Sequence, residues 1–195
     1  MLLIIEGGNR LRKPRKGTVM HSYPGMVALV TAYNEGKQNI MAAGWHSYIS
    51  MDPPIYGVAI GKERYTYGLV NESGSFSINF LPYEKAASIQ GTGNISGIAH
   101  DKFDSLGLLY EKGITIPAPI LVDAYVAYEC KVIDRNTYGD HDWFVGEITQ
   151  FYRDDTKFLD NGLPNLEEID IPLYLGRSSY SSIDNKSVVE TFSKR

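Results

Sequence analysis

Short apolar segments separated by turn residues run along the chain, and this pattern predicts a mainly β fold. Residues 75–81 alternate between apolar and polar side chains, with Phe76, Ile78 and Phe80 on one face, as in a half-buried strand. The remaining segments are apolar runs of similar length. We expect strands over residues 26–33, 39–50, 55–60, 75–81, 124–133 and 143–151.

Turn residues divide these strands. The sequence Asn34-Glu35-Gly36-Lys37 is typical of a hairpin turn, and residues 138–141 predict a second turn. Residues 51–54 contain Pro53 and Pro54, which would remove two donors from the ladder of a central strand. We therefore expect a bend there between two strands.

Three short helices are expected between the strands. Thr66 can cap a helix that runs to Ser73, and Gly74 can end it. Two further helices are expected over residues 82–90, closed by Gly91, and over residues 101–106, closed by Gly107.

Together these elements predict one β-barrel domain with helical insertions. Residues 1–19 are expected to be a lead-in, which is basic over residues 10–17, and residues 20–180 to form the barrel domain. Residues 181–195 are expected to be a tail, and the chain beyond Asp160 is expected to be extended and weakly structured.

Composition excludes several classes of function. The net charge of -4 argues against a nucleic-acid groove. No segment approaches the roughly 20 apolar residues of a membrane span, and the apolar run of residues 2–5 is too short for a signal peptide. The single cysteine, Cys130, excludes an intrachain disulfide and predicts a reducing, cytoplasmic location. The four histidines are too scattered to predict a metal site.

The loop of residues 61–66 has the chemistry of a phosphate site. Lys62, Arg64 and a helix that begins at Thr66 would supply two cations and free backbone N–H groups, next to Gly61. A charged surface loop that leads into a helix is the alternative interpretation. A basic loop of this size favours FMN over FAD.

Residues 41–45 could receive a flat aromatic ring. Ala42, Ala43 and Gly44 allow close approach of the backbone, while Met41 and Trp45 are bulky neighbours at either end. A tightly packed barrel interior would explain the same small residues.

His141 lies in the predicted turn at residues 138–141, just before a strand, and is the histidine best placed to contact a substrate or nicotinamide. A solvated turn histidine is the alternative. Residues 91–97 have the pattern G-x-G-x-x-x-G after a helix, which fails the Rossmann fingerprint in both spacing and context.

Ordered matches from about residue 20 to residue 180 resemble the flavin reductase-like family with the FMN-binding split barrel, and its flavoredoxin branch most closely. The matching segments are residues 37–41, 43–45, 53–54, 64–67, 77–79, 101–103, 107–108, 129–131, 139–141, 144–147 and 160–164. The resemblance implies a Greek-key-like six-stranded barrel with helical insertions. It also implies a homodimer with non-covalent FMN near the subunit interface.

The resemblance also implies roles for individual residues. The flavin-contacting segments of the family fall on residues 41–45, on residues 61–66 and on Asn79. The histidine beside nicotinamide and flavin falls on His141. The chain departs from the family at Ala42-Ala43-Gly44, where a Thr or Ser hydroxyl is expected before the tryptophan.

Three functions follow from these observations. The first is an oxidoreductase whose FMN takes electrons from NADH or NADPH and passes them to free flavin or another acceptor. The second is an electron carrier between protein partners that uses no pyridine nucleotide. The third is a barrel without cofactor that serves as a binding or structural module.

Overall fold

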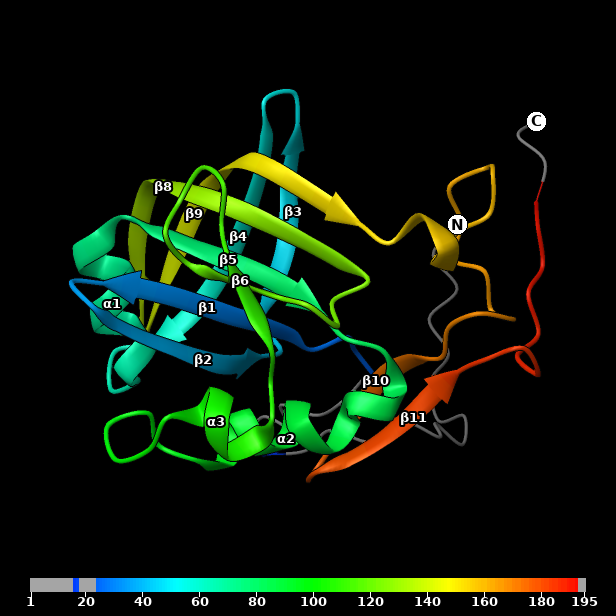
Figure 1. Cartoon of the computed structure of the whole chain (residues 1–195), viewed down its shortest axis with the longest axis horizontal. Coiled ribbons are helices and arrows are strands. Elements are labelled where there is room, and N and C mark those ends of the chain that lie inside the picture. The colour runs from blue at the N-terminus through cyan, green and yellow to red at the C-terminus, as the bar shows by residue number, and fades with distance from the viewer. Residues whose placement is uncertain (1–15, 18–23, 193–195) are drawn as a thin grey trace, which may run out of the picture.

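The computed structural model describes residues 16–17 and 24–192, so most of the expected lead-in lies outside the described residues. The fold is mainly β, as predicted, and Figure 1 shows a curled sheet with helices at one end and along one side. Seven strands form the main sheet in the order β2-β1-β5-β8-β9-β4-β3. Their bounds are β1 (Ala28–Asn34), β2 (Lys37–Ala43), β3 (His46–Met51), β4 (Pro54–Gly61), β5 (Ser75–Phe80), β8 (Val126–Tyr138) and β9 (His141–Arg153).

All pairings in this sheet are antiparallel. The other elements are α1 (Tyr65–Ser73), η1 (Tyr83–Lys85), α2 (Ala86–Asn94), α3 (Lys102–Leu106), β6 (Tyr110–Lys112), β7 (Pro119–Leu121), η2 (Asp155–Lys157), β10 (Ile171–Gly176) and β11 (Ser179–Ile183). Strands β6 and β7 form one two-stranded sheet, and β10 and β11 form another.

The hairpin between β1 and β2 confirms the predicted turn. Asn34 pairs with Lys37, and Glu35 and Gly36 between them have φ of 46° and 80°. Positive φ at both central residues is the geometry of a tight hairpin turn, which glycine adopts without steric cost.

The single strand expected over residues 39–50 is wrong, because the chain breaks at Gly44 and Trp45. Strand β2 before the break and strand β3 after it lie at opposite edges of the sheet. The Ala59 N–H of β4 donates to the Trp45 carbonyl over 2.9 Å, which extends the β3–β4 pairing by one step, and β2 itself contacts β4 across the opening between the two edges. The main sheet therefore has one strand more than the six expected.

Two apolar clusters hold the sheet. Val30 and Ile78 belong to the cluster inside the barrel, whereas Leu29 and Ile40 pack on the other face against Ile89 of α2. Each fully buried aliphatic side chain of this kind stabilises the fold by about 1.5–3 kcal/mol. Because β5 is covered on both faces and all its residues are buried, the half-buried strand expected there is wrong.

The helices correct two boundary predictions. Arg64, not Thr66, is the N-cap of α1, and Thr66 is buried inside the first turn. Gly74 ends α1 with φ of 65°, as predicted. Helix α2 continues past Gly91 to Asn94, and Gly91 packs against Leu106 of α3, whose side chain lies 2.6 Å from where a Cβ would be.

The expected weakly structured tail is also wrong in part. Strands β10 and β11 form a hairpin, and the Tyr180 hydroxyl lies 3.2 Å from Oε1 of Gln90 on α2. In Figure 1 this hairpin runs beside α2. The C-terminal part of the chain thus covers the helical side of the barrel.

Candidate functional site

A cavity of about 380 Å³ opens where the end of β2, the loop from β4 to α1 and the end of α2 converge. It is lined by residues 41–45, 63–66 and 92–98, together with Asn39, Ala59, Gly61, Lys102 and His141. This size lies in the roughly 300–1,000 Å³ range of ligand sites. All the residues predicted for the site line it except Lys62 and Asn79.

The small residues at the end of β2 leave backbone accessible to the cavity. Around Gly44, no atom lies within 4 Å of the place that a Cβ would occupy. A Cβ added to Gly93 would lie 3.6 Å from the Cβ of Ala42, in ordinary van der Waals contact. The end of α2 therefore lies against the end of β2. Trp45 is 42% exposed at the other end of the segment.

The loop between β4 and α1 brings Arg64 and a helix N-terminus to the cavity. No side chain caps α1, and the backbone N–H groups of Tyr65 and Thr66 have no acceptor within the described part of the chain. Arg64 pairs with Glu63 over 3.0 Å, and both side chains are more than half exposed. Such an exposed pair is weak, so an anionic ligand could compete for Arg64.

Lys102 is a site residue that the sequence analysis missed. Its side chain is buried, and its ammonium donates to the carbonyls of Ile40 (2.9 Å) and Thr92 (2.7 Å). Burial and, to a smaller extent, the positive charge of Arg64 lower the pKa of Lys102 to about 8. Arg64 and Lys102 are therefore two basic residues that line the cavity, together with the acidic Glu63.

The segment after α2 was also missed. Residues 92–98 line the cavity, although their glycine pattern does not fit a dinucleotide loop. Gly97 lies so close to the Asn39 amide that a Cβ would overlap it, and Asn39 in turn donates to Thr66 Oγ1 over 2.8 Å. The usable signal was the close spacing of Gly91, Gly93 and Gly97.

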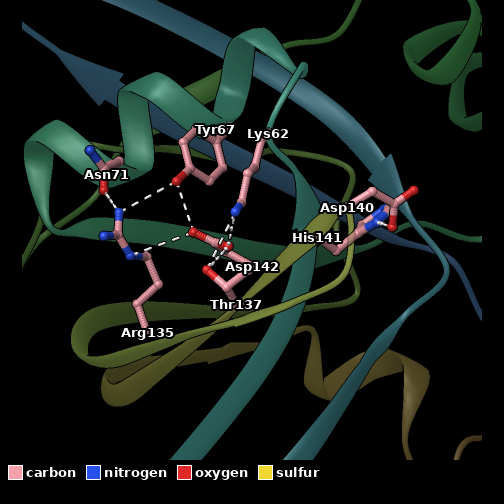
Figure 2. Close-up of polar contacts among 8 residues, drawn as sticks. All are labelled: Lys62, Tyr67, Asn71, Arg135, Thr137, Asp140, His141 and Asp142. Carbon is pink, nitrogen blue, oxygen red and sulfur yellow. Dashed lines mark hydrogen bonds and ion pairs between the residues drawn. The ribbon is translucent and has the colours of Figure 1, made fainter.

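Lys62 does not line the cavity, and Figure 2 shows its side chain directed at Asp142 and Thr137. Its ammonium lies 3.3 Å from Asp142 and 3.4 Å from Thr137. Asp142 is buried and also accepts hydrogen bonds from Tyr67 (2.8 Å) and Thr137 (2.7 Å), with Arg135 at 3.6 Å. The Thr137 hydrogen bond lowers the pKa of Asp142 most, and Tyr67 and Lys62 add to it against the effect of burial. Lys62 thus fastens the β4–α1 loop to the β8–β9 hairpin.

Asn79 also lies outside the cavity lining, deep between strands. Its amide donates to the Leu29 carbonyl (3.2 Å) and to Ser77 Oγ (2.8 Å), and its oxygen accepts from the Leu121 N–H (2.9 Å). These bonds join β1, β5 and β7.

His141 occupies the rim of the cavity beside Trp45, with ring centroids 4.8 Å apart. His141 Nδ1 lies 2.8 Å from Asp140 Oδ1, and Figure 2 shows this pair directed away from the Asp142 network. The hydrogen bond from His141 is the main cause that lowers the pKa of Asp140. Within the described residues, His141 Nε2 has no hydrogen-bond partner.

Metal sites and membrane-spanning helices are absent from the described residues. No cluster of three or more His, Cys, Asp or Glu side chains is placed to hold a metal ion. None of the described helices is both long enough and apolar enough to cross a membrane. Cys130 is fully buried, and burial raises the pKa of its thiol, as expected for a core residue.

Relatives and solved structures share this architecture. Flavoredoxin of Desulfovibrio vulgaris (Miyazaki F) is 30% identical, with a TM-score of 0.81 over 93% of this chain and 98% of that chain. An FMN-binding protein from Thermus thermophilus, solved with bound 1-cyclohex-2-enone, is 32% identical, with a TM-score of 0.79 over 95% of this chain and 98% of that one. An uncharacterized protein of Aeropyrum pernix is 36% identical over 80% of this chain but only 59% of its own length.

A relative with a named activity is the NADH-dependent flavin reductase of Rhodococcus sp., which is 26% identical over 67% of this chain and 71% of its own length. The family model described as "Flavin reductase like domain" matches residues 20–184. These matches support a flavin-related oxidoreductase. The chain belongs to the flavin reductase-like domain family.

Proposed function

We propose that the cavity between the end of β2, the β4–α1 loop and the end of α2, called the main cavity from here on, binds FMN without a covalent bond. We also propose that the protein is an oxidoreductase that takes electrons from NADH or NADPH. The observation that carries this proposal is the single cavity in which the small residues at the end of β2 face the cationic start of α1. Bound FMN would supply hydride and electron transfer, and the chain would bind, orient and tune it.

The phosphate is assigned to Arg64 and the free N–H groups of Tyr65 and Thr66. A helix N-terminus with unpaired N–H groups favours anions, and arginine can bind phosphate through two parallel hydrogen bonds. Lys62 is left out of this assignment because Asp142 already holds its ammonium.

The ring is assigned to residues 41–45, where Gly44 leaves open space next to the backbone. Lys102 is bonded to the carbonyl of Ile40, one residue before this segment, so its charge would lie beside the ring. There it would favour negative charge on the polar edge of the ring.

His141 is assigned to the place where the ring meets nicotinamide. It lies against Trp45 at the rim, and its free Nε2 can donate or accept a hydrogen bond there. The name of the Rhodococcus relative, an NADH-dependent flavin reductase, supports the use of a pyridine nucleotide.

An electron carrier is the second candidate, because flavoredoxin of Desulfovibrio vulgaris matches almost the whole chain. We also propose a homodimer, which light scattering on a sizing column can test, and a cytoplasmic location, which the lone buried Cys130 supports.

The experiment is a visible spectrum of the protein with FMN, recorded without oxygen before and after adding NADH and then NADPH. Prompt bleaching of bound flavin is expected for the oxidoreductase. Bound flavin that only dithionite reduces would favour the carrier, and the absence of bound flavin would reject both.

Replacement of His141 by Ala should leave FMN bound and slow its reduction by NAD(P)H, since the rim loses its hydrogen-bonding group. The control is His100→Ala, which removes an exposed histidine that does not line the cavity. Full reduction rates in His141→Ala would remove His141 from the site.

A further inference from the structure

Glu63 is the only acidic side chain among the described residues that line the main cavity. Its Oε1 lies 3.0 Å from Nε of Arg64, so the cation assigned to the phosphate of FMN is already paired with a carboxylate. Both side chains are open to solvent, Glu63 by 64% and Arg64 by 56%. An anion that enters the cavity therefore meets a carboxylate beside the cation that it would bind.

The turn between β4 and α1 holds this carboxylate in place. The Arg64 N–H donates to the Gly61 carbonyl over 3.0 Å, which closes a tight turn with Lys62 and Glu63 at its centre. The carboxylate oxygens of Glu63 fold back over Gly61, at 2.6 and 2.8 Å from the place that a Cβ would occupy. Glycine leaves this space free, whereas a side chain at position 61 would displace the carboxylate.

The two basic residues of this turn are paired with very different acids. Lys62 lies 3.3 Å from Asp142, which is buried and held by further donors. Arg64 has only the exposed Glu63, and an exposed pair of this kind contributes little to stability. The pair of Lys62 is therefore a fixed part of the fold, whereas the pair of Arg64 can open at little cost.

We propose that Glu63 determines the flavin specificity of the site, because it competes with the ligand phosphate for Arg64. The competition lowers the preference of the cavity for FMN over riboflavin and speeds the release of FMN. This role rests on the proposed function. It favours a flavin that leaves the site between reaction cycles over the permanently bound flavin of a carrier.

The competition follows from charge. A phosphate that binds Arg64 must displace Glu63, and the displaced carboxylate stays on the adjacent residue, where it repels the phosphate. Riboflavin has the same ring and ribityl chain but no phosphate, so Glu63 affects its binding little. The ratio of the Kd for riboflavin to the Kd for FMN therefore isolates the effect of Glu63.

Flavin fluorescence titrations of the full chain with FMN and with riboflavin measure this ratio. Glu63→Gln should raise it about threefold to tenfold, through tighter binding of FMN, because one weak pair and one like-charge contact are removed. Release of FMN after rapid dilution should slow by a similar factor, since such differences lie mostly in dissociation. The control is Glu72→Gln, which removes the same charge at the opposite end of α1, where Glu72 accepts a hydrogen bond from Asn34.

A second variant, Gly61→Ala, moves Glu63 without removing its charge. Gly61 is not among the glycines with positive φ, so alanine fits its backbone, and the new Cβ would take the place of the carboxylate. The preference for FMN should rise here too, but by less than in Glu63→Gln, because the charge stays nearby. An effect of the methyl group on the ring would change both Kd values and cancel in the ratio.

Arg64→Ala distinguishes competition for the cation from simple repulsion of the phosphate. In an Arg64→Ala protein, adding Glu63→Gln should change the ratio much less than it does in the unchanged protein. An undiminished rise there would overturn the proposal. An unchanged ratio in Glu63→Gln, an equal rise in Glu72→Gln, or no rise in Gly61→Ala would overturn it as well.

The unchanged protein separates failure of the proposed function from failure of the role of Glu63. Binding of neither flavin would reject the proposed function, and the role of Glu63 with it. Binding of both flavins with a ratio that does not depend on Glu63 would reject only this role and leave the flavin site standing. Circular dichroism and Tm of Glu63→Gln should match those of the unchanged protein, since the lost pair is exposed.

Discussion

Two buried carboxylates on the β8–β9 hairpin are stabilised in different ways. Glu129 is fully buried and accepts hydrogen bonds from the N–H groups of Ile114, Thr115 and Ile116, from the Thr115 hydroxyl, and from the Tyr152 hydroxyl. Asp142 is also buried but has cations, Lys62 and Arg135, among its partners. Neutral donors alone stabilise the charge of Glu129, whereas neutral donors and two cations together stabilise the charge of Asp142.

This difference corresponds to a difference in role. The donors to Glu129 come mostly from one loop, so its carboxylate holds residues 114–116 against the sheet, away from the candidate site. Asp142 instead joins α1, the β4–α1 loop and the hairpin that carries His141, as Figure 2 shows. The first carboxylate anchors a loop, whereas the second fixes the elements around the candidate site.

The largest expected effect is on stability, in Glu129→Gln. The amide NH₂ of glutamine would face N–H and O–H donors, so the free energy of unfolding should fall by at least about 3 kcal/mol, because several charge-assisted bonds are lost. Asp142→Asn should cost less, since Lys62 and Arg135 are 46% and 43% exposed and can be solvated by water. Urea unfolding at pH 7 measures both, and Glu111→Gln on exposed β6 is the control.

The pH dependence tests the same comparison. Burial alone would raise the pKa of Glu129, but the hydrogen bonds from Thr115, Tyr152 and the backbone outweigh it and lower the pKa. Its stabilisation is therefore present above the unfolded pKa near 4.5 and is lost as pH falls through the lower folded pKa. If Glu129→Gln and the unchanged protein lost stability in parallel below pH 4.5, this account of Glu129 would be wrong.

The next prediction distinguishes the roles of the two basic residues of the β4–α1 loop. Arg64→Ala should raise the Kd for FMN about 10–100-fold, the equivalent of about 1.5–3 kcal/mol for a charge-assisted bond. Lys62→Ala should change this Kd much less and should instead lower Tm, because Asp142 loses a cation. Flavin fluorescence titration and thermal unfolding measure the two effects, with the exposed Lys186→Ala as control. An equal loss of FMN affinity in both variants would restore Lys62 to the phosphate site.

The sequence predicted those features that depend on local conformation. The hairpin at Glu35-Gly36 and the end of α1 at Gly74 require positive φ. Glycine adopts positive φ without steric cost, so Gly36 and Gly74 indicate these positions in the sequence. The turn between β10 and β11 escaped notice because Arg177 and Ser178 adopt positive φ there, and neither is a usual residue for that conformation.

Features that depend on distant partners could not be predicted. The sequence shows that Lys62 is charged, but not that Asp142 lies within 3.3 Å of it. Lys102 was missed because lysines are rarely buried, and its acceptor on Ile40 is 62 residues away along the chain. Family resemblance placed His141 and residues 41–45 near each other, and the structure brings them to one cavity.

The smallest effect concerns Lys102, whose charge neither carboxylate neutralises. The pKa of Lys102 is lowered to about 8 in the folded protein, from an ordinary value of 10.5. Between pH 8 and 10.5 Lys102 is therefore mostly deprotonated in the folded protein and still mostly protonated in the unfolded chain. Its contribution to stability should therefore rise from pH 8 to 10.5, while FMN affinity should fall by less than about tenfold in total as the charge beside the ring disappears. Lys102→Gln should abolish both trends, and the exposed Lys131→Gln should retain them. Because stability and affinity are expected to change in opposite directions, a general weakening of the fold at high pH cannot produce this result.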